Sequence, residues 1–309
     1  TRLDYYYWIQ ERENPKVKEY LNAENEYLEA MMKHTEGLQE NLYNEMVGRL
    51  KKSDASVPYK LDDYYYYNRY EPGNEYPIYC RKKGSLEAAE EILLNVNEMA
   101  KGHNYYHVAA VTPSPDHRMI AFGIDTVSRR KYTIRVKNLE TGELLEDKIP
   151  NTTGSATWAN DNKTVFYIVR DKTLRPYQVL KHKLGDAVEK DTEVFVENDV
   201  TYRVDVFRSK SKKYVFIASA STLSSEFRYL EADSPDAAPK VFHTRENDLL
   251  YNLDHLNGKF YILTNWDAKN FRLMEASAEK TSKDNWKEII QHRDDVMLAN
   301  FEIFKNFLA

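Results

Sequence analysis

One stretch of the chain sets the pattern that the rest repeats: PSPDHRMIAFGIDTVSRRKYTIRVKNLETG, residues 113–142. It opens with a turn, continues through an apolar run from Met119 to Ile124, and then breaks at polar residues. A second run, Tyr132 to Val136, alternates its side chains and ends in another turn. Short runs of this kind between turn residues indicate β-strands. The stretch therefore predicts one antiparallel unit of turn, strand, turn, strand and turn.

Two markers of this unit recur downstream with one period. A basic residue closes the first turn, and its copies lie 45, 50 and 46 residues apart; an aromatic residue opens the second run, and its copies lie 45, 50 and 44 residues apart. Repeats of roughly 40–50 residues with four short strands each are typical of β-propellers. We therefore predict a mainly β protein built as a β-propeller, with a large β-sandwich of similar hairpins as the alternative. The basic markers are Arg118, Lys163, Lys213 and Lys259, and the aromatic markers are Tyr132, Tyr177, Phe227 and Phe271.

The residues before the repeats have a helical pattern. Asn14 followed by Pro15 is a good helix start, and apolar residues then recur at helical spacing as far as Met32. Thr35 is predicted to cap a second helix. We therefore expect an N-terminal α-helical arm over residues 1–57 and a partial propeller over residues 58–309. Amphipathic helices need a surface to cover, which either the repeats or a further domain could supply.

The repeat units account for the chain up to its last residues. A first hairpin is predicted from Tyr64–Tyr70 and Tyr76–Arg81, followed by a short helix or irregular insertion at Ser85–Lys101. About five units fit, and a sixth begins near Phe301. A propeller must close its ring to hide its strand edges, so we expect this chain to be a fragment of a longer protein.

Composition excludes several classes of function. The net charge of −5 over 309 residues gives no electrostatic case for nucleic acid. No run of 18 apolar residues occurs, so no membrane span is predicted. The lone Cys80 cannot form an internal disulfide, which favours a reducing compartment. We therefore expect a cytoplasmic location. The periplasm is the alternative, because a sequence that begins at Thr1 does not tell whether a leader peptide was removed.

No catalytic centre, metal site or cofactor site is predicted from the residues alone. Ser155 lacks the second glycine of a Gly-x-Ser-x-Gly motif. His103 and His107 precede a strand, where residues four apart lie about 13 Å from one another, too far to share a metal ion. Cys80 has no neighbours with zinc-ligand spacing, and no phosphate-binding loop occurs.

One basic cluster is a candidate binding site. The link between the two strands of the first-quoted unit reads Ser128-Arg129-Arg130-Lys131. Three adjacent cations in a hairpin link can engage a carboxylate or an acidic partner domain. A solvated turn is the alternative.

Several pieces of the chain carry a family likeness. The opening YYW at residues 6–8 resembles the start of serine peptidases of the prolyl oligopeptidase family. Further pieces, which keep their order from end to end, resemble its oligopeptidase B (protease II) branch. They are EPGNEYPIY (71–79), SRRKY (128–132), NLETG (138–142), LRPY (174–177), FYILTN (260–265) and KNF (269–271).

The resemblance implies a serine-type endopeptidase that cleaves short peptides after Arg or Lys. It implies a seven-bladed propeller that gates access to a C-terminal α/β-hydrolase domain of the same polypeptide, which carries the Ser-Asp-His triad. This chain would hold the arm and about five of the seven blades, lack the triad and be inactive alone. By position, Arg129 and Arg130 match a basic pair that faces the active-site cavity in the family, so they are candidates for contacts with substrate or between domains.

Two other functions stay open at this point. The first is a stand-alone propeller that scaffolds protein–protein interaction, since no triad is found. The second is a carbohydrate- or surface-binding propeller of a secreted protein, which would need exposed aromatic residues at the channel mouth. The presence or absence of a Gly-x-Ser-x-Gly motif downstream of Ala309 separates these hypotheses from the peptidase.

Overall fold

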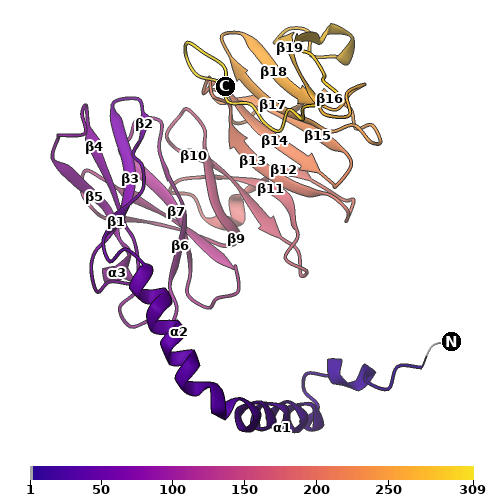
Figure 1. Ribbon diagram of the computed structural model, residues 1–309. Coiled ribbons are helices and arrows are strands. Elements are labelled where there is room, and N and C mark those ends of the chain that lie inside the picture. The colour runs from indigo at the N-terminus through magenta and orange to yellow at the C-terminus, as the bar shows by residue number, and fades with distance from the viewer. Residues whose placement is uncertain (1–2) are drawn as a thin grey trace. The chain divides into compact units, whose positions relative to one another are not determined.

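The computed structural model describes residues 3–309. Contacts within the chain divide it into two compact units, one that ends at Glu91 and one that begins at Ile92. The first contains the helical arm and most of one sheet, and the second contains all the remaining strands (Figure 1). The predicted boundary between arm and propeller, at residues 57/58, stays a prediction.

The arm consists of α1 (Pro15–Met32) and α2 (Glu36–Arg49), with short 3-10 turns η1 (Tyr7–Gln10) and η2 (Lys33–Thr35). Asn14 caps α1 as predicted, because its side chain accepts a hydrogen bond of 3.0 Å from the Lys16 N–H. The prediction that Thr35 caps α2 is wrong. The chain continues through Thr35 in a helical conformation, and its hydroxyl donates back to the Met32 carbonyl at 2.7 Å.

The apolar residues of the arm are mostly exposed. Val17 is the one buried residue of α1, and α2 has none. Tyr27, Leu38 and Met46 each expose about 60% of their surface or more (64%, 59% and 61%). Helices of this length are marginal in water without packing. The arm therefore presents an apolar surface that is suited to covering another part of a protein.

The first unit also contributes most of a sheet in the order β1-β3-β4-β5, with β2 paired to β3. The predicted Tyr64–Tyr70 strand is confirmed as β3, but its partner begins at Ile78, just after Pro77, which lacks the N–H that a ladder needs. The expected insertion proves to be a strand followed by one helical turn. The elements are β1 (Asp54–Ala55), β2 (Tyr59–Leu61), β3 (Tyr64–Tyr70), β4 (Ile78–Lys83), β5 (Glu90–Asn95) and α3 (Val96–Met99).

The second unit holds three antiparallel sheets in chain order. One has seven strands, β12-β11-β10-β9-β8-β7-β6, and the others are β13-β14-β15-β16 and β17-β18-β19-β20. Short 3-10 turns, η3 (Val188–Lys190) and η4 (Lys283–Asn285), lie in two of the links. The strands are β6 (His107–Pro113), β7 (Met119–Asp125), β8 (Tyr132–Asn138), β9 (Leu144–Trp158), β10 (Thr164–Arg170), β11 (Pro176–Lys183), β12 (Thr192–Val196), β13 (Arg203–Arg208), β14 (Tyr214–Ala220), β15 (Ser225–Glu231), β16 (Lys240–His243), β17 (Tyr251–Leu256), β18 (Lys259–Thr264), β19 (Arg272–Ser277) and β20 (Lys287–Ile290).

The long strand β9 joins two four-stranded blades into the seven-stranded sheet. Its first part pairs with β8 as far as Thr152, and its second part pairs with β10 from Thr152 onward. Asn151 and Gly154 bend it with positive φ angles of 59° and 97°. A side chain on Gly123 of β7 would lie 2.5 Å from the Gly154 Cα atom, so only glycine allows the two strands to cross here. One continuous strand therefore closes one blade and opens the next.

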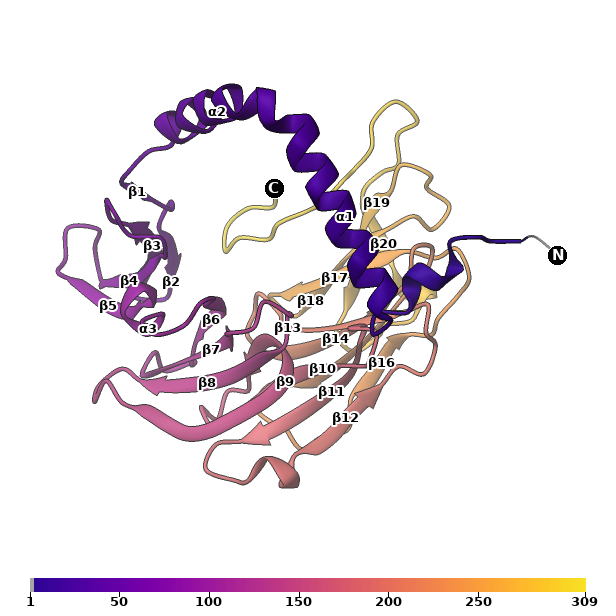
Figure 2. The ribbon, with the colours of Figure 1, turned by 90° about the horizontal axis from the view of Figure 1, so that it is seen from below.

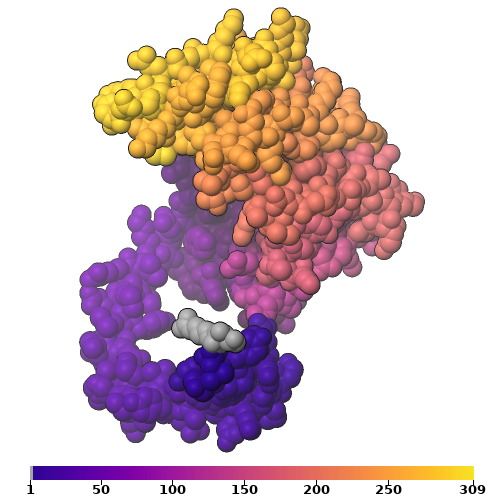
Figure 3. All heavy atoms as spheres, turned by 90° about the vertical axis from the view of Figure 1, so that its right-hand side faces the viewer, coloured from indigo at the N-terminus to yellow at the C-terminus, as the bar shows by residue number. Residues whose placement is uncertain are grey.

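Successive blades of the second unit pack face to face (Figure 2). Three apolar clusters each combine residues from two neighbouring blades. Trp158 anchors the first cluster, Phe166 the second, and Phe260 the third, and all three are fully buried. A fully buried side chain of this kind stabilises the fold by about 1.5–3 kcal/mol or more. The atoms of the last blades form one continuous surface from pink to yellow (Figure 3).

The repeat markers fall where the sequence predicts. Arg118, Lys163 and Lys213 each precede a second strand of a blade, and Lys259 is the first residue of β18. The Asn257-Gly258 turn has two positive φ angles, 52° and 78°, as a tight hairpin requires. Residues 301–308, predicted to begin a sixth unit, form a single isolated bridge between Ile303 and Leu308 and no regular strand.

A buried histidine connects two neighbouring blades. His182 on β11 is fully buried, and its Nδ1 lies 2.6 Å from Asp191 Oδ1 while its Nε2 lies 2.9 Å from Asp147 Oδ1 on β9. Both ring nitrogens of the imidazole therefore face a carboxylate oxygen. The hydroxyl of Tyr167 donates to Asp191 at 2.7 Å, and the Gly185 N–H donates to Asp147 at 2.7 Å. The two carboxylates thus share one imidazole between blades.

We predict that His182→Leu destabilises the second unit. The substitution leaves the buried Asp147 and Asp191 without the imidazole that they share, which should lower the free energy of unfolding by about 3–5 kcal/mol. Chemical denaturation followed by intrinsic fluorescence measures the loss. His103→Leu, at an exposed position, is the control and should change stability by less than about 0.5 kcal/mol. Equal losses in both variants would contradict the role assigned to His182.

Candidate functional site

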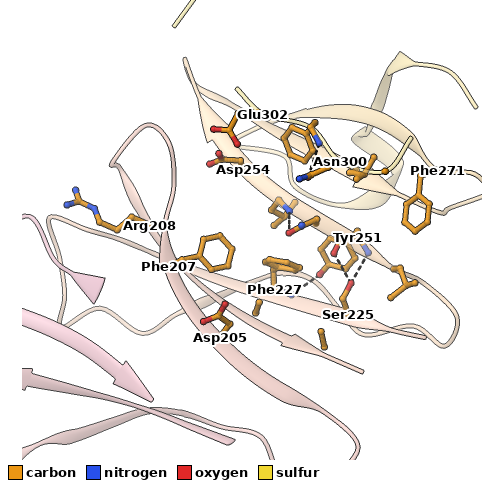
Figure 4. A pocket seen from close by; sticks show the side chains of 18 residues that line it. Asp205, Phe207, Arg208, Ser225, Phe227, Tyr251, Asp254, Phe271, Asn300 and Glu302 are labelled. Carbon is orange, nitrogen blue, oxygen red and sulfur yellow. Dashed lines mark hydrogen bonds between the residues drawn. The ribbon is translucent and has the colours of Figure 1, made fainter. Parts of the chain in front are cut away.

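A large cavity lies between the inner strands β13 and β17 (Figure 4). Its volume is about 650 Å³. Aromatic side chains form much of its wall, and three carboxylates lie along it: Asp205, Asp254 and Glu302. In Figure 4 Asp254 and Glu302 lie close together, whereas Arg208 points away from the aromatic wall. The aromatic residues are Phe207, Phe227, Tyr251, Phe271 and Phe301.

The carboxylates of this cavity already have partners. Asp254 accepts hydrogen bonds from the Lys210 N–H at 2.8 Å and the His255 N–H at 2.7 Å. Glu302 forms an ion pair with the Lys210 ammonium group. Asp205 accepts from the Val206 N–H at 2.8 Å. Burial raises the pKa of Asp205 and of Asp254. The three carboxylates of this cavity are therefore already hydrogen-bonded or ion-paired, so they do not indicate a ligand site.

A second candidate, the pair Ser211 and His255, has the residue types of a nucleophile and its base. The Ser211 hydroxyl lies 2.7 Å from His255 Nδ1. However, the imidazole is almost fully buried between the rings of Tyr214 and Phe260, with centroid distances of 4.8 and 4.9 Å. Burial, with a contribution from nearby Lys213, lowers the pKa of His255 to about 4. A ring so enclosed cannot reach a substrate, so we assign this pair a structural role.

The third candidate is the basic link between β7 and β8, and one buried carboxylate shapes it. Asp125 is 1% exposed and accepts three backbone N–H groups of the link: those of Val127 at 2.9 Å, Arg129 at 3.0 Å and Arg130 at 2.8 Å. Ser128 and Arg130 have positive φ angles of 59° and 55°. Because Asp125 binds the main chain, the side chains of the link remain exposed.

This link and the link between β10 and β11 line a small pocket of about 320 Å³. Arg130 and Lys131 come from the first link, and Arg170 and Lys172 lie at the second. The guanidinium of Arg170 donates a hydrogen bond through Nη1 to the Arg130 carbonyl, which ties the two links together. We call this cavity the basic pocket, after these four residues. Its lining is completed by Asn151, Thr152, Asp171 and Leu174.

The basic pocket has an excess of positive charge. Its one carboxylate, Asp171, binds the Thr173 hydroxyl at 2.6 Å and the Arg175 Nε at 3.1 Å. These hydrogen bonds, that of Thr173 first, hold the pKa of Asp171 at about 2. Among residues 3–309, no carboxylate pairs with Arg130, Lys131, Arg170 or Lys172. Burial, with repulsion from Arg130, lowers the pKa of Arg170. Such a pocket is arranged to take an anion.

The residues singled out from the sequence have different outcomes. Arg130 lines the basic pocket, whereas Arg129 is exposed outside its lining. His107 Nδ1 lies 3.0 Å from the Tyr132 hydroxyl. Within the described part of the chain, no group of three or more His, Cys, Asp or Glu side chains is arranged to hold a metal ion. Sequence reasoning missed Arg170 and Lys172; a comparison of the charges of successive hairpin links would have found them.

Comparisons with known proteins identify the family. The profile described as "Prolyl oligopeptidase, N-terminal beta-propeller domain" matches residues 1–309. A dipeptidyl aminopeptidase BI from Pseudoxanthomonas mexicana is 40% identical over 99% of this chain and 45% of its own length. Protease 2 from Moraxella lacunata is 33% identical over 100% of this chain and 45% of its own length. The structure of oligopeptidase B from Leishmania major superposes with a TM-score of 0.92 at 28% identity, over 99% of this chain and 44% of that one.

The fold is thus a β-propeller preceded by a helical arm, as the sequence predicts. The chain belongs to the prolyl oligopeptidase family and corresponds to its N-terminal propeller domain. It spans about half the length of the curated relatives that it matches. None of the helices in residues 3–309 is both long enough and apolar enough to cross a bilayer.

We predict that Cys80 is unreactive in the folded protein. Burial, with a smaller effect of Glu90, raises the pKa of its thiol to about 12. Only the thiolate reacts with iodoacetamide, and it becomes abundant only as the pH approaches that value. Mass spectrometry after treatment at pH 8 should find Cys80 unmodified in the native protein and alkylated in denaturant. Rapid native alkylation would show that the buried strand β4 opens readily.

We also predict that Asp125→Ala loosens the basic link. Three backbone N–H groups lose their acceptor, so the link should open more often and trypsin should cleave after Arg129, Arg130 or Lys131 at least about tenfold faster. Peptide mapping at short digestion times measures this rate. Asp186→Ala, which removes an exposed carboxylate 3.9 Å from Lys190, is the control and should leave the rate unchanged. Uniform acceleration at sites throughout the chain would indicate global unfolding and would contradict the local role.

Proposed function

We propose that this chain is the arm and propeller region of an oligopeptidase B-like serine endopeptidase. In this proposal a C-terminal α/β-hydrolase domain of the same polypeptide carries the Ser-Asp-His triad and cleaves peptides. The observation that supports it most strongly is the match to the family over the whole chain, combined with relatives of about twice its length. In this proposal residues 1–309 help to bind the substrate and control its access to the active site of the hydrolase domain. The reaction requires no cofactor.

We propose that the propeller admits short peptides and excludes folded proteins. The blades are closely packed, with fully buried residues between them, so the propeller is rigid. In this proposal it leaves no opening wide enough for a folded domain. The exposed apolar residues of the arm, such as Leu38 and Met46, would pack on the hydrolase domain. Access would then depend on relative motion of the two domains, which is the usual behaviour of domains with polar interfaces.

Cleavage after Arg or Lys is our proposal for specificity. It is supported by the similarity to proteins named Protease 2 and oligopeptidase B. The 40% identical relative is named a dipeptidyl aminopeptidase, so removal of dipeptides from a free amino terminus is the second candidate. A substrate with a blocked amino terminus separates the two, because only an endopeptidase accepts it.

Arg129 and Arg130 are proposed to contact the peptide or the hydrolase domain. Both side chains are exposed, and Arg130 lines the basic pocket. We propose a cytoplasmic location for the whole protein, since the lone Cys80 is a free thiol. A propeller that only scaffolds other proteins remains the alternative function.

The full-length polypeptide should hydrolyse blocked peptides with arginine or lysine before the scissile bond, and residues 1–309 alone should show no hydrolysis above buffer. Chromogenic arginyl and lysyl substrates measure both. Arg130→Gln in the full-length protein should change KM more than the melting temperature, whereas Arg118→Gln, at the opposite end of β7, should change neither. Hydrolysis by residues 1–309 alone, or a full-length polypeptide without peptidase activity, would refute the assignment.

A further inference from the structure

We propose that the basic pocket binds the C-terminal carboxylate of a short peptide, with Arg170 and Lys172 acting together with Arg130. The proposal rests on the proposed function, because the peptide is the substrate or product of the whole enzyme. It extends that function by assigning ligands from a second blade and by naming the chemical group that they recognise.

The charges of the pocket support an anionic ligand. Arg130, Lys131, Arg170 and Lys172 line one cavity, while its single carboxylate is engaged by Thr173 and Arg175. Like charges gathered in a partly buried space repel one another, and an anion between them relieves that repulsion. The cations come from two separate hairpin links, so the fold must bring them together; Arg170 accomplishes this by its bond to the Arg130 carbonyl.

The donor groups suit a carboxylate. A guanidinium has five N–H donors in a planar fork that matches the two oxygens of a carboxylate. One nitrogen of Arg170 is fixed on the Arg130 carbonyl, so its side chain is already ordered and loses little entropy on binding. The ammonium group of Lys172 and the side-chain amide of Asn151 add further donors at the lining.

The size of the pocket favours the end of a peptide over a protein surface. A volume of about 320 Å³ accepts a terminal residue with its carboxylate. A helix of another domain, about 10 Å across, would not enter it. Buried Thr152 is part of the lining, and its hydroxyl donates to the Tyr132 carbonyl at 3.1 Å. The volume of the pocket therefore suits the end of a peptide better than an element of a folded domain.

The test compares peptides with a free C-terminal carboxylate and the same peptides with a C-terminal amide, using the full-length protein. We expect the wild-type enzyme to have a KM about tenfold lower for the acid than for the amide. The double variant Arg170→Gln, Lys172→Gln should raise KM about tenfold for the acid and leave the amide unchanged. Arg170→Lys, which retains the charge but not the fork, should fall between the two. Lys183→Gln, an exposed cation at the other end of β11, is the control.

A binding measurement separates this proposal from the proposed function. Fluorescence anisotropy of an amino-terminally labelled tripeptide, as acid and as amide, reports binding even if the protein hydrolyses nothing. Preference for the acid that is lost in the double variant supports the pocket in either case. Equal binding of acid and amide overturns it. The proposal is also overturned if the double substitution affects the acid and the amide equally and lowers the melting temperature. The C-terminal carboxylate of the peptide would then bind to another part of the polypeptide.

Discussion

The fold of the second unit depends on the burial of apolar sheet faces between neighbouring blades. Trp158, Phe166 and Phe260 occupy successive seams, and each belongs to a cluster that combines residues of the two blades at that seam. A single blade cannot bury its apolar face alone, so each blade is stabilised by its neighbours. The apolar residues of the strands are therefore used for packing between blades, and the links between strands remain available for binding.

The links between strands are ordered by carboxylates. These accept hydrogen bonds from N–H groups that have no partner on a neighbouring strand. Asp125 binds three N–H groups of one link, and Asp171 binds Thr173 and Arg175 in the next. Each acid accepts hydrogen bonds from main-chain N–H groups of its link, and Asp171 also forms an ion pair with Arg175. The two hairpins are thus ordered without use of the four cations of the basic pocket, whose positive charge would suit an anion.

Much of the architecture could be predicted from local sequence, but only half of the basic pocket could: Arg130 and Lys131 were singled out, and Arg170 and Lys172 were not. The basic markers, the Asn14 cap and the Asn257-Gly258 turn depend on neighbours in sequence, and all are found where expected. Of the aromatic markers, Tyr132 opens its strand, whereas Phe227 is the third residue of β15 and Phe271 lies just before β19. The shared strand β9 escaped notice because its middle is polar and resembles a loop. Arg170 could not be joined to Arg130 because their meeting depends on which hairpins lie side by side. Thr35 failed as a cap because the chain does not leave the helical conformation there.

The continuity of β9 has a mechanical consequence. Two blades that share one strand cannot rotate against each other without bending a hydrogen-bonded backbone, so they act as a single stiff plate. The later blades are joined by irregular segments, for example those between β12 and β13 and between β16 and β17. Any breathing of this part of the molecule should be concentrated at those joints, and the plate that carries both basic hairpins would move as one piece.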